Sequence, residues 1–152
     1  YGVLVDKRDQ WVSDVVSSCQ ELGLSYTISQ HHADKGDLLG YNVSNEPLYD
    51  LLRKSKTLVT RFSTTVLEAL ALKTSVVYYN PSIEKVDKFN DPLGAYEYAQ
   101  DLESLRDSLQ KASSGWSSYS DNSKKFLKLH CNTEKNTPTK QYIAKTISEI
   151  IL

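Results

Sequence analysis

The segment that decides the fold is Leu58-Val-Thr-Arg-Phe-Ser-Thr-Thr-Val-Leu-Glu-Ala-Leu-Ala-Leu-Lys-Thr-Ser-Val-Val-Tyr-Tyr79. Its apolar pattern predicts a strand at residues 58–60, a helix at residues 64–72 and a second strand at residues 75–79, which Asn80 and Pro81 end. A strand, a helix and a strand joined by short loops predict a parallel pair with a right-handed crossover. This is the repeating unit of a Rossmann-like sheet.

The same alternation continues on both sides of this segment. It predicts further strands at residues 1–5, 24–28, 41–43 and 95–98. It also predicts one helix at residues 10–22, a second helix that begins after Asn45 as its cap, and a third helix at residues 101–112. We therefore predict an α/β fold: a Rossmann-like parallel sheet flanked by helices, with C-terminal tail helices. Such a sheet binds ligands at the carboxyl ends of its strands.

The composition changes after residue 112. Residues 113–123 are rich in serine, which predicts a surface connection, and peripheral tail helices are expected at about residues 122–130 and 139–152. We expect residues 1–112 to form the Rossmann-like donor-binding domain. Residues 113–152 are expected to form a linker and C-terminal helices that pack on the same domain or toward a missing N-terminal domain. The chain opens directly on a predicted strand with no methionine or leader before it, so we expect it to be a piece of a longer protein.

Overall composition is that of a soluble globular protein. The 152 residues suit one α/β domain, and 18 basic against 19 acidic residues, mixed along the chain, argue against nucleic acid as a partner. No apolar run is long enough to form a transmembrane segment, and the first residues of the sequence do not look like a signal peptide. Cys19 and Cys131 lack metal-binding spacing, which predicts two buried thiols of a cytoplasmic protein.

Three consecutive hydroxyl residues, Ser63, Thr64 and Thr65, lie where the strand gives way to the helix. A helix start offers unpaired N–H groups and a positive dipole end, which predicts a phosphate-binding turn. Glu68 follows Thr64 by four positions, so it shares that helix face and can accept hydrogen bonds from a ribose. Thr65 and Glu68 also fit the capping-box pattern, in which the glutamate only ties down its own helix start.

The segment resembles the signature of hydroxyl residues followed by Glu-Ala in the C-terminal domains of GT-B-type glycosyltransferases. Ser63 to Thr65 match the hydroxyl residues, Glu68 matches the ribose-binding acid, and residues 75–81 are similar to the strand and Asn-Pro turn that follow. Lys73 stands where the family usually has glycine. The resemblance implies a domain that binds a nucleotide-sugar donor and works beside an N-terminal acceptor domain outside this sequence.

The resemblance also implies further binding residues. His31 takes the histidine position of a loop similar to the His-Pro loop of several bacterial glycosyltransferases, although His32 replaces the proline. Lys7 and Arg8 follow the first predicted strand, where the family places basic groups that neutralise the leaving diphosphate. Arg61, at the end of a strand, is a further candidate for this charge. Backbone groups of Asn42, Val43 and Ser44 are expected to contact the nucleobase, so the base itself is not readable from side chains.

The function that follows is transfer of a sugar from a nucleotide donor to an unidentified acceptor, with no metal and no cofactor beyond the donor. The helix start, the hydroxyls and the basic side chains would share the work of a divalent cation. No general base is recognisable in this part of the chain. Two alternatives stay open: a sugar-nucleotide epimerase, which uses a comparable hydroxyl-and-glutamate helix, and a Rossmann-like interaction module in which Thr65 and Glu68 only cap a helix.

Overall fold

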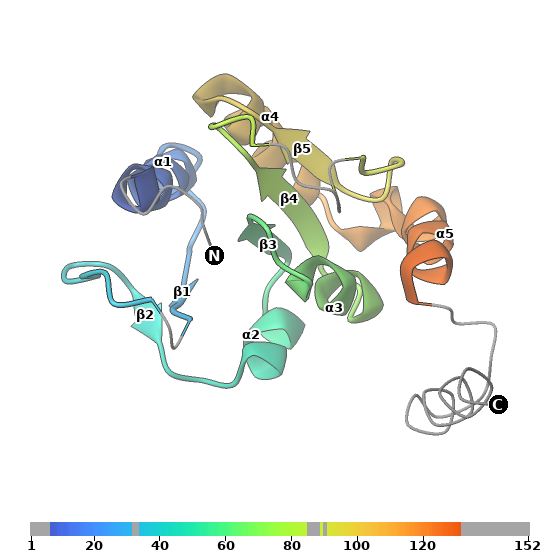
Figure 1. The fold of residues 1–152 in the computed structure, drawn as a ribbon, viewed down its shortest axis with the longest axis horizontal. Helices are drawn as coiled ribbons and strands as arrows, with labels where there is room; N and C mark the ends of the chain where they lie inside the picture. The colour runs from blue at the N-terminus through green and yellow to red at the C-terminus, as the bar shows by residue number, and fades with distance from the viewer. Residues whose placement is uncertain (1–6, 32–33, 85–88, 90, 132–152) are drawn as a thin grey trace, which may run out of the picture.

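The structure is a computed structural model, and it describes residues 7–31, 34–84, 89 and 91–131. Parallel strands with helices packed around them form an α/β fold (Figure 1). The predicted strand at residues 1–5 and the predicted helix at residues 139–152 lie outside the described residues. In chain order the helices and strands are α1 (Arg8–Glu21), β1 (Ile28–Ser29), β2 (Val43–Ser44), α2 (Leu48–Lys54), β3 (Thr57–Thr60), α3 (Thr65–Ala71), β4 (Ser75–Tyr79), β5 (Glu97–Ala99), α4 (Leu102–Ser113) and α5 (Ser120–Cys131).

The strands form two small sheets, and every pair is parallel. β3, β4 and β5 lie in chain order in one sheet, while β1 pairs with β2 in the other. Parallel neighbours require a connection that crosses back over the sheet, and α3 provides it between β3 and β4. The predicted Rossmann-like α/β architecture is therefore confirmed.

β4 is the centre of the core, because all five of its residues are buried. Val76 and Tyr78 join the apolar cluster on the side of α3 and α5, and Val77 and Tyr79 join the cluster on the side of α1 and α4. Helices thus cover both faces of this sheet, which explains why β4 is an unbroken apolar run rather than an alternating one. Burial of each of these valines stabilises the fold by about 1.5–3 kcal/mol.

α1 connects the two sheets. The Trp11 indole N–H donates a 3.0 Å hydrogen bond to the Tyr79 carbonyl, and the Tyr79 hydroxyl donates a 2.9 Å bond to the buried Asp14 carboxylate. Burial first, and then the Asp14 charge, raise the pKa of Tyr79 well above its ordinary value, so this hydroxyl remains a donor. Elsewhere on α1, Val12 and Val16 pack in a cluster that includes Ile28 of β1.

α5 packs on the same domain, which is one of the two placements expected for the C-terminal helices, but it enters the core and is not peripheral. Phe126 is 1% exposed and lies in the cluster that contains Tyr78, and the buried Ser123 hydroxyl donates a 2.9 Å bond to the Ala95 carbonyl. Trp116 and Tyr119, which both precede this helix, also cover the domain itself. The sequence did not predict this packing because the serine-rich residues before α5 contain few apolar side chains.

Several local predictions differ from the structure. Pro47, not Asn45, precedes the first residue of α2, since Pro47 keeps an extended ψ of 138°. β1 and β2 are only two residues long, and just before them the Asn42 side-chain amide donates to the Tyr26 carbonyl at 2.7 Å. Cys19 is buried as expected, whereas Cys131 is exposed at the end of α5.

α3 ends at a turn that favours glycine but carries Lys73. Lys73 has a φ of 63°, and the N–H groups of Lys73 and Thr74 donate to the Leu70 and Ala69 carbonyls at 3.2 and 2.9 Å. This is the hydrogen-bond pattern of a Schellman motif, whose left-handed position is usually glycine. The lysine therefore holds a strained backbone conformation at the position where the resembled family has glycine.

We expect Lys73→Gly to raise the free energy of unfolding by about 0.5–1 kcal/mol, because glycine adopts positive φ without steric cost. Urea denaturation monitored by circular dichroism measures this change. Lys56→Gly is the matched control: Lys56 is also exposed but does not have positive φ, so this substitution should be neutral or destabilising. Equal effects of the two glycines would contradict the interpretation.

Candidate functional site

The candidate site lies at the carboxyl edge of the β3–β4–β5 sheet. Thr60 pairs with Tyr78 and Tyr79 pairs with Ala99, so the three strands end side by side. The turn after β3, residues 61–64, and the loop after β4, residues 80–84, therefore leave the sheet at the same edge. This is the edge at which open α/β sheets bind ligands.

Phe62 gives the turn after β3 its shape. Its φ of 52° is rare for a residue with a side chain, and its N–H donates a 3.3 Å bond to the Tyr78 hydroxyl. The two rings meet edge to face at 6.2 Å. A left-handed non-glycine residue costs about 1–3 kcal/mol and persists only where surrounding contacts enforce it. Contacts with β4 thus fix the turn that contains the predicted hydroxyl residues.

The hydroxyl residues are brought together as predicted, but they have different surroundings. The Ser63 and Thr65 hydroxyl oxygens lie 2.6 Å apart, and the Ser63 hydroxyl accepts a 3.1 Å bond from the Thr65 N–H. Thr64 is exposed. The N–H groups of Ser63 and Thr64 donate to no acceptor within the described part of the chain. These N–H groups and the Thr64 hydroxyl are free donors at the sheet edge.

Glu68 does not form the capping box that its spacing with Thr65 allows. α3 begins at Thr65, so Thr64 is the N-cap residue, and its side chain makes no capping bond. Glu68 is half-buried, and its carboxylate has no hydrogen bond or ion pair to any residue that the structure describes. Capping of its own helix therefore does not account for this glutamate.

Arg61 has a partner that the sequence did not reveal. Its Nε lies 3.8 Å from Oε2 of Glu84, and the two side chains are only 13% and 17% exposed. The guanidinium also lies over the Phe62 ring, 5.2 Å from its centre. Arg61 and Glu84 are 23 positions apart on different loops, so no local pattern could have paired them.

Asn80 builds the loop that carries Glu84. Its fully buried side chain accepts a 3.2 Å bond from the Glu84 N–H and donates to the Glu84 carbonyl at 3.1 Å and to the Tyr98 hydroxyl at 2.9 Å. Tyr98 in turn stacks on Tyr78 with ring centres 5.4 Å apart. Burial raises the pKa of Tyr78, although the Phe62 N–H acts against this shift. The Asn-Pro turn signal located this loop but not its role at the edge.

Arg8 is already engaged inside the chain. Its Nε and one terminal nitrogen donate to Oδ2 of Asp34 at 3.0 and 2.8 Å, and it also donates to Asp9. Burial acts to raise the pKa of Asp34, but hydrogen bonds from Arg8 and the Gly36 N–H hold it below its usual value. Arg8 therefore organises the loop after β1. Lys7 precedes the first turn of α1 and is exposed.

The remaining predicted residues lie at the β1–β2 sheet. His31 is exposed, two positions beyond the end of β1, and its carbonyl accepts the Asp34 N–H at 2.8 Å. The Asn42 amide is occupied by the Tyr26 carbonyl, and the Ser44 hydroxyl accepts the Glu46 N–H at 3.1 Å. Val43 is 37% exposed in β2. The Asn42 carbonyl accepts the Ile28 N–H at 2.8 Å, so part of the backbone of this segment is also engaged in pairing with β1.

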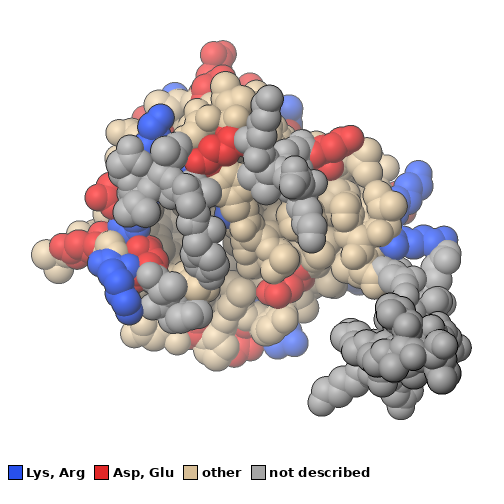
Figure 2. All heavy atoms as spheres, in the orientation of Figure 1, with Lys and Arg blue, Asp and Glu red and all other residues tan. Residues whose placement is uncertain are grey.

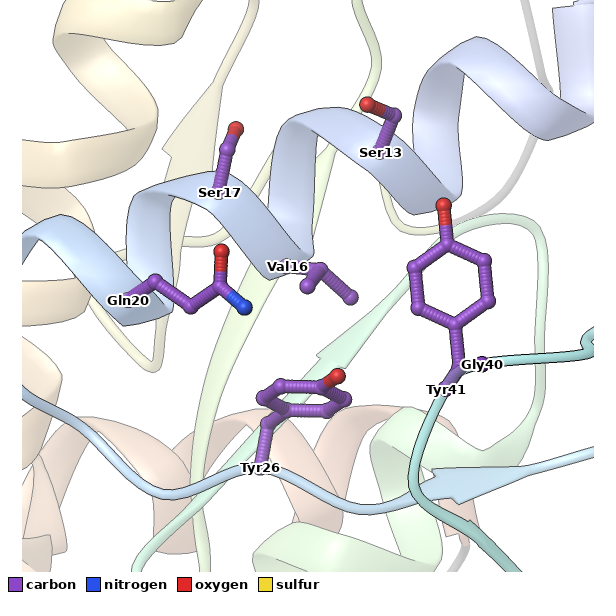
Figure 3. A pocket seen from close by; sticks show the side chains of 7 residues that line it. All are labelled: Ser13, Val16, Ser17, Gln20, Tyr26, Gly40 and Tyr41. Atoms are coloured by element: carbon purple, nitrogen blue, oxygen red, sulfur yellow. The ribbon is translucent and has the colours of Figure 1, made fainter.

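A separate hollow lies beside α1. It has a volume of about 190 Å³ and contains none of the predicted residues. Figure 3 shows side chains of α1 on one side and the Tyr26 and Tyr41 rings on the other. Ligand pockets usually enclose about 300–1,000 Å³, so this hollow is small for a nucleotide. The residues that line it are Ser13, Val16, Ser17, Gln20, Tyr26, Gly40 and Tyr41.

Other surface and sequence features do not single out another site. The uncovered surface in Figure 2 shows acidic and basic side chains interspersed, without a continuous patch of one sign. Within the described ranges, no three His, Cys, Asp or Glu side chains are grouped as metal ligands, and no helix has the length and apolar character to cross a membrane.

Comparison of the chain with protein-family models, curated proteins and solved structures found no match.

We expect Asp34→Asn to lower the free energy of unfolding at pH 7 by up to about 1 kcal/mol, because it removes the charged partner of Arg8. The pKa of Asp34 is lower in the folded than in the unfolded chain, so its contribution is present above about pH 4 and is lost as the pH falls through the folded pKa. Wild type and variant should therefore approach equal stability in strong acid. Urea unfolding at pH 7 and about pH 2.5 checks this, with the exposed Asp107→Asn as control. A difference that does not depend on pH would contradict it.

Proposed function

We propose that this chain is the nucleotide-sugar-binding domain of a cytoplasmic GT-B-type glycosyltransferase. The observation that carries the proposal is Glu68, a half-buried carboxylate with no partner among the described residues, one helical turn beyond free donors at the carboxyl edge of a parallel sheet. A carboxylate that neither caps its helix nor joins an ion pair is available to accept hydrogen bonds from a ligand. A ribose diol supplies two suitable donors.

The roles of the other groups follow from charge. The free N–H groups of Ser63 and Thr64 and the Thr64 hydroxyl would bind phosphate oxygens, and Arg61 would supply the positive charge. Donors fixed in position before the reaction stabilise the negative charge that develops on the leaving diphosphate. Backbone groups of residues 42–44 would contact the base. The acceptor and the general base would belong to the N-terminal domain that the resemblance implies.

Titration with UDP, GDP, CDP and CMP tests the proposal. We expect at least one nucleotide to shift the amide resonances of residues 63–68 in heteronuclear NMR spectra. Absence of any shift in this segment with all four nucleotides at millimolar concentration would overturn the proposal.

We expect Glu68→Ala to weaken binding of that nucleotide about ten- to a hundredfold, which corresponds to loss of charged hydrogen bonds worth about 1.5–3 kcal/mol. The free energy of unfolding should change by no more than about 0.5 kcal/mol, because no cap is lost. Calorimetric titration and urea denaturation measure the two effects. Glu103→Ala, at an exposed site on α4, is the matched control and should leave affinity unchanged. Lower stability with unchanged affinity would assign Glu68 a structural role.

A further inference from the structure

The Arg61–Glu84 pair is an ion pair without a hydrogen bond. The 3.8 Å between Nε of Arg61 and Oε2 of Glu84 exceeds the usual 2.7–2.9 Å of a charge-assisted bond. Nη1 of Arg61 and Oε2 of Glu84 are both buried, and neither has a hydrogen-bond partner among the residues that the structure describes. A guanidinium normally uses its donors in pairs toward a carboxylate or a phosphate. The contact with Glu84 therefore leaves donor capacity of Arg61 unused.

The backbone of Glu84 is held more firmly than its carboxylate. Asn80 binds both the N–H and the carbonyl of Glu84, whereas the carboxylate has Arg61 as its charged neighbour. The loop can therefore keep its course while the guanidinium changes partner. Ser82, in the same loop, contributes a further buried hydroxyl that has no hydrogen-bond partner in the described part of the chain.

We propose, building on the nucleotide-binding function above, that Glu84 is a resident counter-ion of Arg61 and that a phosphate group of the ligand replaces it. Without ligand, Glu84 compensates a guanidinium that is largely removed from water. With ligand, the guanidinium turns away from Glu84 and donates to a phosphate oxygen, and Glu84 remains as a nearby negative charge that opposes binding. Glu84 thus sets the affinity of the site for anionic groups and favours ligands whose charge competes effectively for Arg61.

Calorimetric titration of the full chain with inorganic pyrophosphate tests this role. We expect Glu84→Gln to bind pyrophosphate about three- to tenfold more tightly than the wild type, because removal of one competing ion pair shifts affinity by this order. Glu84→Asp keeps the charge and should stay close to the wild-type affinity. Glu103→Gln makes the same charge change at an exposed site on α4 and should have no effect. In an Arg61→Gln background, Glu84→Gln should no longer tighten the binding of pyrophosphate.

The wild-type chain provides a second measurement that does not depend on a folded variant. Saturating pyrophosphate should shift the Nε–H resonance of Arg61. Unchanged or weaker binding by Glu84→Gln, or an unshifted Arg61 resonance at saturation, would overturn the inference.

The two proposals can fail separately. If nucleotides bind but Glu84→Gln does not tighten pyrophosphate binding, only the role of Glu84 fails. If pyrophosphate behaves as expected but no nucleotide binds, the nucleotide-binding function fails and the anion site remains.

Discussion

The parallel pairing of Thr60 with Tyr78 fixes where β3 and β4 end, and the geometry of the candidate site depends on it. Tyr78 contributes to both the core and the edge. Its ring packs in the cluster beneath α3, and its hydroxyl accepts the Phe62 N–H that holds the turn in its left-handed conformation. A shift of one residue in this register would move Tyr78 to the other face of the sheet and remove that hydroxyl from the turn.

Burial of β4 on both faces makes this edge rigid. Helices pack on each side of the strand, so its residues cannot move without disturbing two apolar clusters. The hydrogen bonds of Asn80 and the ring stack of Tyr98 extend this order one layer beyond the strand ends. The more exposed groups, Thr64 and Glu68, therefore stand on a fixed base, which is the arrangement that a preorganised binding site requires.

The sequence predicted the features that arise from local patterns. The change from strand to helix spacing located β3, α3 and β4, the hydroxyl run located the turn, and Asp101 caps α4 with a 2.8 Å bond from the Ser104 N–H. The features that it missed join distant segments. The pairing of Arg61 with Glu84 depends on loops that meet only after the sheet forms, and the core position of α5 depends mainly on one aromatic residue, Phe126. The capping-box spacing of Thr65 and Glu68 allowed a cap that the structure does not form, because the spacing alone does not specify the residue at which the helix begins.

Glu68 and Glu84 are two carboxylates at one sheet edge with opposite surroundings. Glu84 is mostly buried beside a guanidinium, and a buried charge without a counter-ion costs several kcal/mol, so this pair offsets the cost of keeping Arg61 at the edge. Glu68 is half-buried and unpaired, so it does not contribute to charge balance within the described part of the chain. The free donors of the turn are neutral amides and a hydroxyl, which attract phosphate without needing a counter-ion of their own. A site that combines one compensated cation with neutral donors can remain folded when empty and still gain positive potential when its counter-ion is displaced.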